Sequence, residues 1–323
     1  MSRALVLAVD GGGSRTRAAV IGDAGQVLGR GTAGASNHLL VARDTAQASI
    51  AAAIVEALST AGVGWPQIGM TAAGLAGVDY DRRGAEVGRA MLEACGARDP
   101  LVEGDMVIAH AGALAGGPGV LALAGTGSAV LAIDACDRRE KIGGWGPIYG
   151  DQGSAFRIAQ MGLAAAARAF DGTGERTMLI DALNTALGLT DFRESSSRVY
   201  GSGMSYREIA ALSPIVAETA TRGDDVARRI LERAGQDLAF DVATAAARLE
   251  MRVGISVSYA GAVLTGCDSV RAAFEAAVRA RMPIAHVAPP RLPPIAGAYL
   301  LARRRSGCPV PAEAMPALER MEW

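Results

Sequence analysis

The sequence predicts an α/β protein built from two similar domains. Predicted strands and helices alternate through most of the 323 residues, and each half opens with a strand, a glycine-rich turn and a second strand. A glycine cluster, Gly116–Gly119, separates the halves. Because hydrophobic residues make up 50% of the chain, each domain can bury a core of its own. The repeated opening indicates an internal duplication.

The first domain is expected to span residues 1–116. Apolar runs and helical spacing of apolar residues, such as Ile50, Ile54 and Leu58, define its elements. We expect strands at 4–10, 17–21 and 26–31, a helix at 44–61, a strand at 68–73, a helix at 81–95, a strand at 101–103 and a helix at 105–115. Ligand-binding loops of such domains lie at the carboxyl ends of the strands, so we expect the active site between the two halves.

The second domain is expected to span residues 117–323 and to carry a helical insertion. We expect strands at 120–124, 129–134 and 141–143, a helical region at 154–250 whose last helix is 224–249, a strand at 253–259, a helix at 269–281, a strand at 284–287 and a helix at 294–305. The last helix is predicted to pack back on the first domain. Prolines 309, 311 and 316 predict an irregular tail.

Two glycine-rich turns occupy matching places in the two halves, 10–16 with the sequence DGGGSRT and 125–128 with the sequence GTGS. Such turns direct backbone N–H groups toward a polyphosphate, and the Asp10 carboxylate suits magnesium. A single turn of this kind is often only a hairpin turn, but two matching turns favour binding of the ATP phosphates. The predicted phosphate contacts are Gly11, Gly12, Gly13, Ser14 and Thr16 in the first turn and Gly125, Thr126, Gly127 and Ser128 in the second.

Further polar residues fit the binding of a sugar and the removal of a proton from it. Asp105 follows a strand and begins a helix, where it either caps the helix or serves as a base for an acceptor hydroxyl. Asn37 and His38 lie in the loop before the first helix, where they bind a ligand or stabilise a turn. The segment 143–154 adds an indole, a carboxylate and an amide, groups that suit sugar rings and hydroxyls, although a surface loop with an N-cap is the alternative.

Composition excludes several other classes of protein. A formal charge of −1 gives no basic field for nucleic acid, and the only lysine, Lys141, lies in no P-loop motif. The four cysteines lack metal-binding or redox spacing, which is typical of free thiols in a reducing compartment. With no signal-peptide core or membrane-spanning run, the sequence predicts a soluble cytoplasmic protein.

Taken together, these motifs resemble the N-acetylglucosamine kinase and glucosamine kinase branch of the BadF/BadG/BcrA/BcrD ATPases, within the sugar kinase, Hsp70 and actin superfamily. The resemblance covers nearly the whole chain. It rests on five blocks in order: DGGGSRT from Asp10, SNHLL from Ser36, EGDMVIAHAGA from Glu103, LAGTGSA from Leu123 and GGWGPIYGDQGSAFRIA from Gly143.

The resemblance implies two ribonuclease-H-like domains of the actin-like ATPase type that close over ATP, Mg²⁺ and a sugar. It implies that Asp105 is the base, that Asp10 holds Mg²⁺ through water, and that the substrate is N-acetylglucosamine, converted to its 6-phosphate, or glucosamine. The implied sugar contacts are Asn37, Gly144, Trp145 and Asp151, and the implied adenosine contacts are in residues 259–262, Gly261 among them. Dimers are common in the family, so the resemblance allows a homodimer.

The chain departs from the family pattern at three places, and the identity of the sugar substrate stays open. Ser14-Arg15 stands where Thr-Lys is frequent, Ala260 where a glycine is common, and Gln152 where an acid is usual. A similar DQG occurs in relatives that take unacetylated glucosamine, and another acceptor such as N-acetylmuramic acid is also compatible. The alternatives are a BadF-type ATPase without kinase activity, which would need cysteines for an iron–sulfur cluster, and a sugar-responsive regulator.

Overall fold

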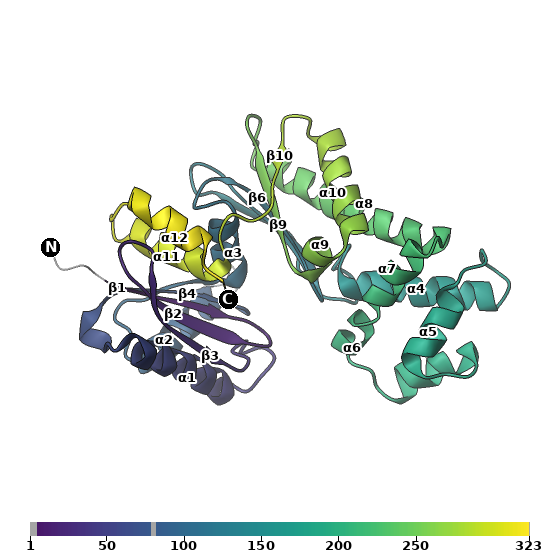
Figure 1. Cartoon of the computed structure of the whole chain (residues 1–323), viewed down its shortest axis with the longest axis horizontal. Coiled ribbons are helices and arrows are strands. Elements are labelled where there is room, and N and C mark those ends of the chain that lie inside the picture. Colours follow the sequence, from purple (N-terminus) through teal and green to yellow (C-terminus); the bar gives the residue numbers. More distant parts are fainter. Residues whose placement is uncertain (1–4, 79–81, 323) are drawn as a thin grey trace. The chain divides into compact units, whose positions relative to one another are not determined.

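The computed structural model describes residues 5–78 and 82–322, which form two compact α/β units (Figure 1). The first unit combines the chain up to Gly117 with the chain from Pro289 onward, and the second runs from Pro118 to Ala288. Each unit contains a mixed five-stranded sheet with helices packed on it. The predicted α/β class is therefore confirmed.

The sheet of the first unit begins with three antiparallel strands and continues with two parallel ones. Its strands are β1 (Leu5–Gly11), β2 (Thr16–Ile21), β3 (Val27–Ala33), β4 (Ile68–Leu75) and β5 (Leu101–Gly104), in the spatial order β3-β2-β1-β4-β5. Both β4 and β5 run parallel to β1. Residues Val6–Val9 are all fully buried, because helices cover both faces of the central strand. This explains the unbroken apolar run that the sequence shows there.

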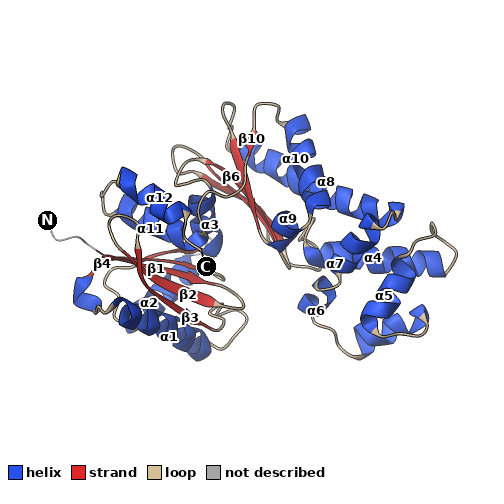
Figure 2. Ribbon diagram, in the orientation of Figure 1, coloured by secondary structure: helices blue, strands red, loops and turns tan. Residues whose placement is uncertain are grey.

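Helices cover the two faces of this sheet in pairs (Figure 2). On one face lie α1 (Arg43–Ala61) and α2 (Arg82–Ala94), and on the other lie α3 (Asp105–Ala113) and α11 (Pro294–Arg305). The helix α1 buries Ile50, Ile54 and Leu58, as their spacing predicts. The predicted start of the second helix at Asp81 lies outside the described residues.

The C-terminal segment belongs to the first unit, so the second unit ends earlier than the predicted domain 117–323. The reason is packing, because α11 lies against α3 and β1. Tyr299 donates a hydrogen bond to the Asp23 carbonyl at 3.0 Å, and buried Arg303 pairs with the Asp23 carboxylate. The tail, expected to be irregular, forms a short 3-10 turn and helix α12 (Met315–Glu319), which buries Leu318.

The second unit repeats the strand arrangement of the first. Its strands are β6 (Gly119–Ala124), β7 (Ser128–Ile133), β8 (Arg139–Gly143), β9 (Ser256–Ala260) and β10 (His286–Val287), in the order β10-β9-β6-β7-β8. As in the first unit, the first three strands are antiparallel, and the fourth pairs with the first in parallel. Strand β9 begins at Ser256 rather than at Val253, because Gly254 adopts a left-handed φ of +56°.

In the part of the chain that the structure describes, the second unit contains seven α-helices. They are α4 (Ala155–Phe170), α5 (Leu179–Leu187), α6 (Tyr206–Ala210), α7 (Ser213–Thr221), α8 (Asp225–Arg248), α9 (Ala262–Gly266) and α10 (Asp268–Arg281). The helix α8 packs on the sheet and against α10, while α4 to α7 form the predicted helical insertion. Their buried side chains join one core that includes Leu238, Val242 and Phe274.

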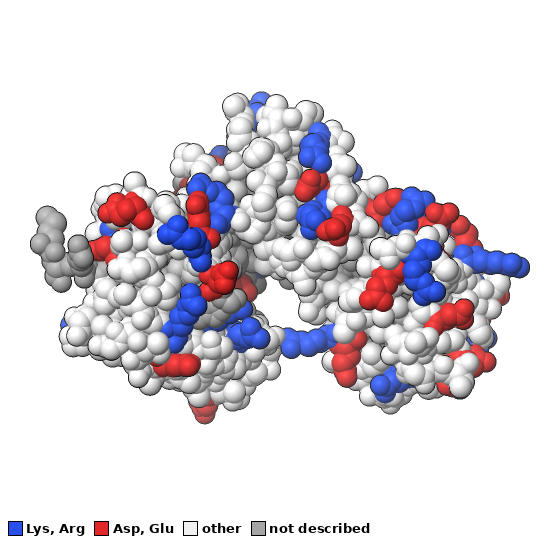
Figure 3. Space-filling view, in the orientation of Figure 1, with Lys and Arg blue, Asp and Glu red and all other residues white. Residues whose placement is uncertain are grey.

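Among its described residues, the face of the molecule seen in Figure 3 has no large patch of only positive or only negative side chains. Arg and Lys side chains are interspersed there with Asp and Glu. This mixing agrees with the formal charge of −1. Within residues 5–78 and 82–322, no helix is both long and apolar enough to cross a bilayer.

Helix α11 approaches α3 so closely that Gly297 is required. A Cβ at Gly297 would lie 1.9 Å from the Ile108 carbonyl oxygen. We expect Gly297→Ala to lower the free energy of unfolding by roughly 2 kcal/mol, because backbone displacement outweighs the helix-propensity gain of alanine. Denaturant unfolding measures this change. The matched control is Gly34→Ala, where the new methyl would meet only an ordinary 3.5 Å contact with Ser49, so an equal loss in both variants would contradict the prediction.

Candidate active site

Parallel pairing brings two carboxylates to the same edge of the first unit's sheet. Asp10 near the end of β1 lies opposite Gly74 of β4, and Gly74 lies opposite Glu103 of β5. Asp105 follows β5 directly as the first residue of α3. The carboxyl ends of parallel strands share one edge, where ligand-binding groups of α/β sheets gather. Asp10 and Asp105 are close enough for their charges to interact.

Burial makes the charge on Asp10 unfavourable. The pKa of its carboxyl rises from an ordinary value of 3.8 to about 6, chiefly because the group is desolvated. Arg17, directly opposite Asp10 in β2, lowers this pKa, and the negative charge of Asp105 raises it. A carboxylate in this position would be stabilised by a cation. A Mg²⁺ ion held by one or two carboxylates and by phosphate fits these residues.

The described residues contain no cluster of three or more His, Cys, Asp or Glu side chains placed to hold a metal. This agrees with the usual Mg²⁺ site of phosphoryl-transfer enzymes, which keeps several waters and uses few protein ligands. The role of Asp10 as a Mg²⁺ ligand through water, with Asp105 as its carboxylate neighbour, stays a prediction.

Asp105 is not the N-cap of its helix. The N-cap of α3 is Gly104, and Asp105 is the first helical residue, half-buried, with its Oδ1 accepting the Met106 N–H at 2.9 Å. The positive end of the helix dipole favours an ionised carboxylate in this first turn. Asp105 thus lies half-buried at the sheet edge as the first residue of α3, and the capping alternative is not what the structure shows.

Backbone hydrogen bonds hold the first glycine-rich turn against the loop before α1. The Gly12 N–H donates to the Arg15 carbonyl at 2.8 Å, and the Ser36 N–H donates to the Gly12 carbonyl at 3.1 Å. A Cβ at Gly11 would lie 2.4 Å from Ser36 Oγ, so the turn and the loop can meet only at a glycine. Ser14 is exposed. Thr16 is fully buried and donates to the Gly34 carbonyl at 2.7 Å, so its hydroxyl serves the fold.

The loop that carries Asn37 and His38 lies beside this turn. Asn37 Oδ1 accepts the Leu39 N–H at 3.0 Å, the turn-stabilising role that the sequence left open. Ser36 Oγ and His38 Nδ1 are buried polar atoms with no hydrogen-bond partner among the described residues. Such atoms are costly unless a ligand or water satisfies them. Sequence reasoning missed Ser36 as a candidate, because burial of its hydroxyl beside Gly11 is visible only in the fold.

The second glycine-rich turn is attached to the N-terminus of α4. The Ala155 N–H donates to the Gly125 carbonyl at 2.9 Å, and the Phe156 N–H donates to the Thr126 carbonyl at 3.3 Å. Ser128 Oγ donates to the Gln152 carbonyl at 2.7 Å, which fixes the other end of the turn. A Cβ at Gly125 would meet no atom within 4 Å, so this side of the turn is open. The turn therefore sits at the positive end of a long helix, a place that favours phosphate.

Asp151 lies against this second turn in a strained conformation. It is buried with a φ of +57°, and a Cβ at Gly127 would lie 2.7 Å from its Oδ2. Burial raises the pKa of the Asp151 carboxyl, while hydrogen bonds from the Ser128 and Gly146 N–H groups and the charge of Arg157 lower it. The structure thus places Asp151 beside the predicted phosphate contacts.

The other predicted sugar contacts lie in the loop between β8 and α4. Gly144 has a left-handed φ of +73°, and a Cβ there would lie 3.0 Å from Lys141 Cε. Trp145 next to it is 67% exposed, so its indole face is accessible to a ligand. The structure brings these two residues together with Asp151 within one loop.

A cavity in the second unit lies beside Gly261 and α4. Gly261 has a φ of +88°, and a Cβ there would lie 2.4 Å from the Ala124 carbonyl oxygen, so the end of β9 reaches the second turn. The cavity has a volume of about 310 Å³, and α4, α7 and α9 line it. Its lining is mostly apolar, with Ser213 and Glu218 as polar members. The sequence did not predict either residue as a site residue, because no glycine-rich motif marks α7.

The sequence profile of the BadF/BadG/BcrA/BcrD ATPase family matches residues 7–302. The chain belongs to this family. Among its relatives, an N-acetylmuramic acid/N-acetylglucosamine kinase of Clostridium acetobutylicum is 27% identical over 92% of this chain and 98% of its own length. An N-acetyl-D-glucosamine kinase of Dictyostelium discoideum is 29% identical over 74% of this chain and 78% of its own length.

A solved structure shares the fold. It is a protein of Chromobacterium violaceum assigned as an N-acetylglucosamine kinase, with a TM-score of 0.71, 23% sequence identity and coverage of 94% of this chain and 100% of that one. At this identity the likeness establishes the fold. It confirms the fold that the family resemblance implies.

Replacing Asp10 by asparagine should change how stability depends on pH. In the folded protein Asp10 keeps its proton to a pH of about 6, against an ordinary value of 3.8, so the wild type loses stability as pH rises through that window. We expect Asp10→Asn to gain about 2 kcal/mol relative to the wild type between pH 4 and pH 7. Denaturant unfolding at both pH values measures this. The control is Asp44→Asn, at an exposed position in α1. A gain in the free energy of unfolding for Asp10→Asn no larger than for Asp44→Asn would refute the raised pKa of Asp10.

Proposed function

We propose that the chain is an ATP-dependent kinase that phosphorylates a hydroxyl of an amino sugar, N-acetylglucosamine to its 6-phosphate or glucosamine. The observation that carries this proposal is the pair of carboxylates at the edge of the first sheet, with a desolvated Asp10 beside Asp105 at the head of α3. The kinase activity of the two relatives that span most of the chain supports the same reaction.

Asp105 is the base in this proposal. The residue is half-buried at the sheet edge, it begins a helix whose dipole favours the ionised form, and its neighbour Asp10 carries negative charge. An acceptor hydroxyl within hydrogen-bond reach would pass its proton to Asp105 as the oxygen attacks the γ-phosphorus of ATP. The bond that forms joins the sugar oxygen to phosphorus, and the bond that breaks releases ADP.

Asp10 would hold Mg²⁺ through water, together with the ATP phosphates. The ion supplies neutralisation of the charge on the transferring phosphoryl group. The free-energy cost of keeping Asp10 ionised falls when a cation is close, so a bound metal would favour the ionised form of this buried carboxylate.

The two glycine-rich turns and the cavity beside Gly261 would bind the nucleotide. The N–H groups of Gly12 and Gly125 are bonded within their turns, so the other glycines of Gly11–Gly13 and Gly125–Gly127 would present backbone N–H groups to the phosphates, the second turn with the dipole of α4 behind it. The cavity of about 310 Å³, apolar except for a few polar groups, suits adenosine.

The sugar would be bound by Asn37, His38, Gly144, Trp145 and Asp151. An exposed indole such as that of Trp145 provides a face for the C–H side of a pyranose ring. The unpartnered Nδ1 of His38 offers a hydrogen-bonding atom beside the first turn. The choice between acetylated and free amino sugars depends on contacts of a few atoms, which a substrate panel resolves.

The panel tests the proposed reaction. We expect release of ADP from Mg-ATP to depend on an added amino sugar, because the sugar supplies the hydroxyl that attacks. A coupled ADP assay with N-acetylglucosamine, glucosamine, N-acetylmuramic acid, N-acetylmannosamine and glucose, against a control without sugar, measures this. Hydrolysis of ATP at the same rate with and without every sugar would sink the kinase proposal.

Substitution of Asp105 tests the assigned base. Asp105→Asn keeps the shape of the side chain but removes its basicity, so we expect kcat to fall by roughly 10²- to 10⁴-fold. Binding of ATP, measured by calorimetry, should change little, because Asp105 faces the acceptor. The control Asp44→Asn should retain the wild-type kcat. A turnover near normal in Asp105→Asn would remove Asp105 from the role of base.

A further inference from the structure

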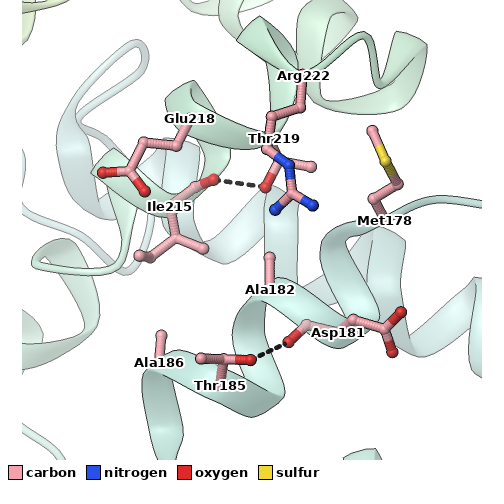
Figure 4. A pocket seen from close by; sticks show the side chains of 9 residues that line it. All are labelled: Met178, Asp181, Ala182, Thr185, Ala186, Ile215, Glu218, Thr219 and Arg222. Carbon is pink, nitrogen blue, oxygen red and sulfur yellow. Dashed lines mark hydrogen bonds between the residues drawn. The ribbon is translucent and has the colours of Figure 1, made fainter.

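A second cavity of the second unit lies on the other side of α7 from the proposed nucleotide cavity. It has a volume of about 390 Å³, and its lining comes from α5 and α7 with the residues beside them (Figure 4). Its charged members are Asp181, Glu218 and Arg222. The two threonine hydroxyls in the lining donate to carbonyls of their own helices, Thr185 to Asp181 at 2.9 Å and Thr219 to Ile215 at 2.7 Å. The charged groups therefore decide what this cavity can bind.

The charges in this cavity do not neutralise one another. Glu218 and Arg222 are four residues apart, the spacing at which ion pairs commonly form along a helix. Among the described residues, however, neither takes part in an ion pair. Figure 4 shows the Arg222 guanidinium directed toward Ala182 of α5, while the Glu218 side chain lies on the side of Ile215. An anion can thus reach the guanidinium within the cavity.

A simple anion does not match this lining, because Asp181 and Glu218 would repel it. A ligand that carries both signs of charge matches it better. Its anionic group would bind the Arg222 guanidinium, which favours phosphate and carboxylate through paired N–H donors, and its ammonium group would bind Asp181 or Glu218. A volume of about 390 Å³ accommodates a monosaccharide phosphate.

We infer that this cavity is a second binding site, separate from the proposed active site, for a small zwitterion of the amino-sugar phosphate class. That class is the product of the proposed reaction when the acceptor is an unacetylated amino sugar, so the identity of the ligand rests on the proposed function. The cavity and its charges do not depend on it. A carboxylate zwitterion such as an amino acid shares the same chemistry and is separated from the sugar phosphate by the test.

Occupancy of this site is expected to influence nucleotide binding. Glu218 lines both cavities, and α7 forms the wall between them, with Ile215 and Thr219 toward one and Pro214 and Ala217 toward the other. A ligand ammonium that draws the Glu218 carboxylate toward itself changes the lining of the nucleotide cavity. Linkage requires the nucleotide and the zwitterion to change each other's affinity by the same factor.

Calorimetric titration of the full chain with glucosamine 6-phosphate tests the site. We expect two binding events in the wild type and loss of one in Arg222→Ala, whose affinity at this cavity should fall roughly 10- to 100-fold when the charged hydrogen bonds are removed. Ala182→Leu, which fills the cavity without removing a charge, should abolish the same event. The matched control is Arg252→Ala, at an exposed arginine outside the lining, with thermal unfolding as the check on folding.

Titrations with three further ligands identify which chemical groups the cavity binds. Glucose 6-phosphate lacks the ammonium, glucosamine lacks the phosphate, and L-serine replaces the phosphate by a carboxylate, so each should bind more weakly at this cavity than glucosamine 6-phosphate. Tighter binding of serine would overturn the sugar-phosphate assignment. Unchanged titrations in Arg222→Ala and Ala182→Leu would overturn the site, and an unchanged ADP affinity with the cavity filled by ligand would overturn the coupling. Failure of the kinase proposal would appear elsewhere, as ADP release without sugar dependence.

Discussion

The desolvated charge of Asp10 beside Asp105 is the interaction on which this account depends. Apolar strands with helices on both faces end at the sheet edge, and the chain places a carboxylate there instead of another apolar residue. Burial raises the pKa of Asp10 to about 6, so near neutral pH the folded state keeps an unfavourable charge. A fold that only needed stability would favour a neutral residue at this position. We propose that a cation and a phosphate chain bind beside this carboxylate.

The same strand order in both units gives each a glycine-rich turn after its first strand, but the turns are supported differently. In the first unit the turn is held by the loop at Ser36, and in the second by the N-terminus of α4. The first support leaves Ser36 Oγ buried against Gly11 without a hydrogen-bond partner among the described residues, and the second aligns a helix dipole with the turn. Duplication of one topology has thus produced two glycine-rich turns with different supports, both of which we propose as phosphate contacts.

Much of this architecture could be predicted from the sequence, because the strands are unbroken apolar runs and α1 repeats its apolar residues at helical spacing. The two carboxylates could also be predicted, since Asp10 lies near the end of β1, Asp105 directly follows β5, and a parallel sheet aligns these strand ends. The sequence could not show that Thr16 turns its hydroxyl into the fold, that Ser36 Oγ lacks a partner, or that Glu218 of α7 reaches two cavities. Those properties come from contacts between segments that are distant along the chain.

Titration of the Asp10 carboxyl by carbon-13 NMR, with and without Mg²⁺, tests the central claim most directly. We predict a pKa of about 6 for Asp10 in the metal-free protein and a clear decrease when Mg²⁺ and a nonhydrolysable ATP analogue bind, because the cation stabilises the ionised form. Asp10→Asn identifies the resonance. A pKa that stays near 3.8 in both conditions would contradict the claim that this buried charge awaits a cation.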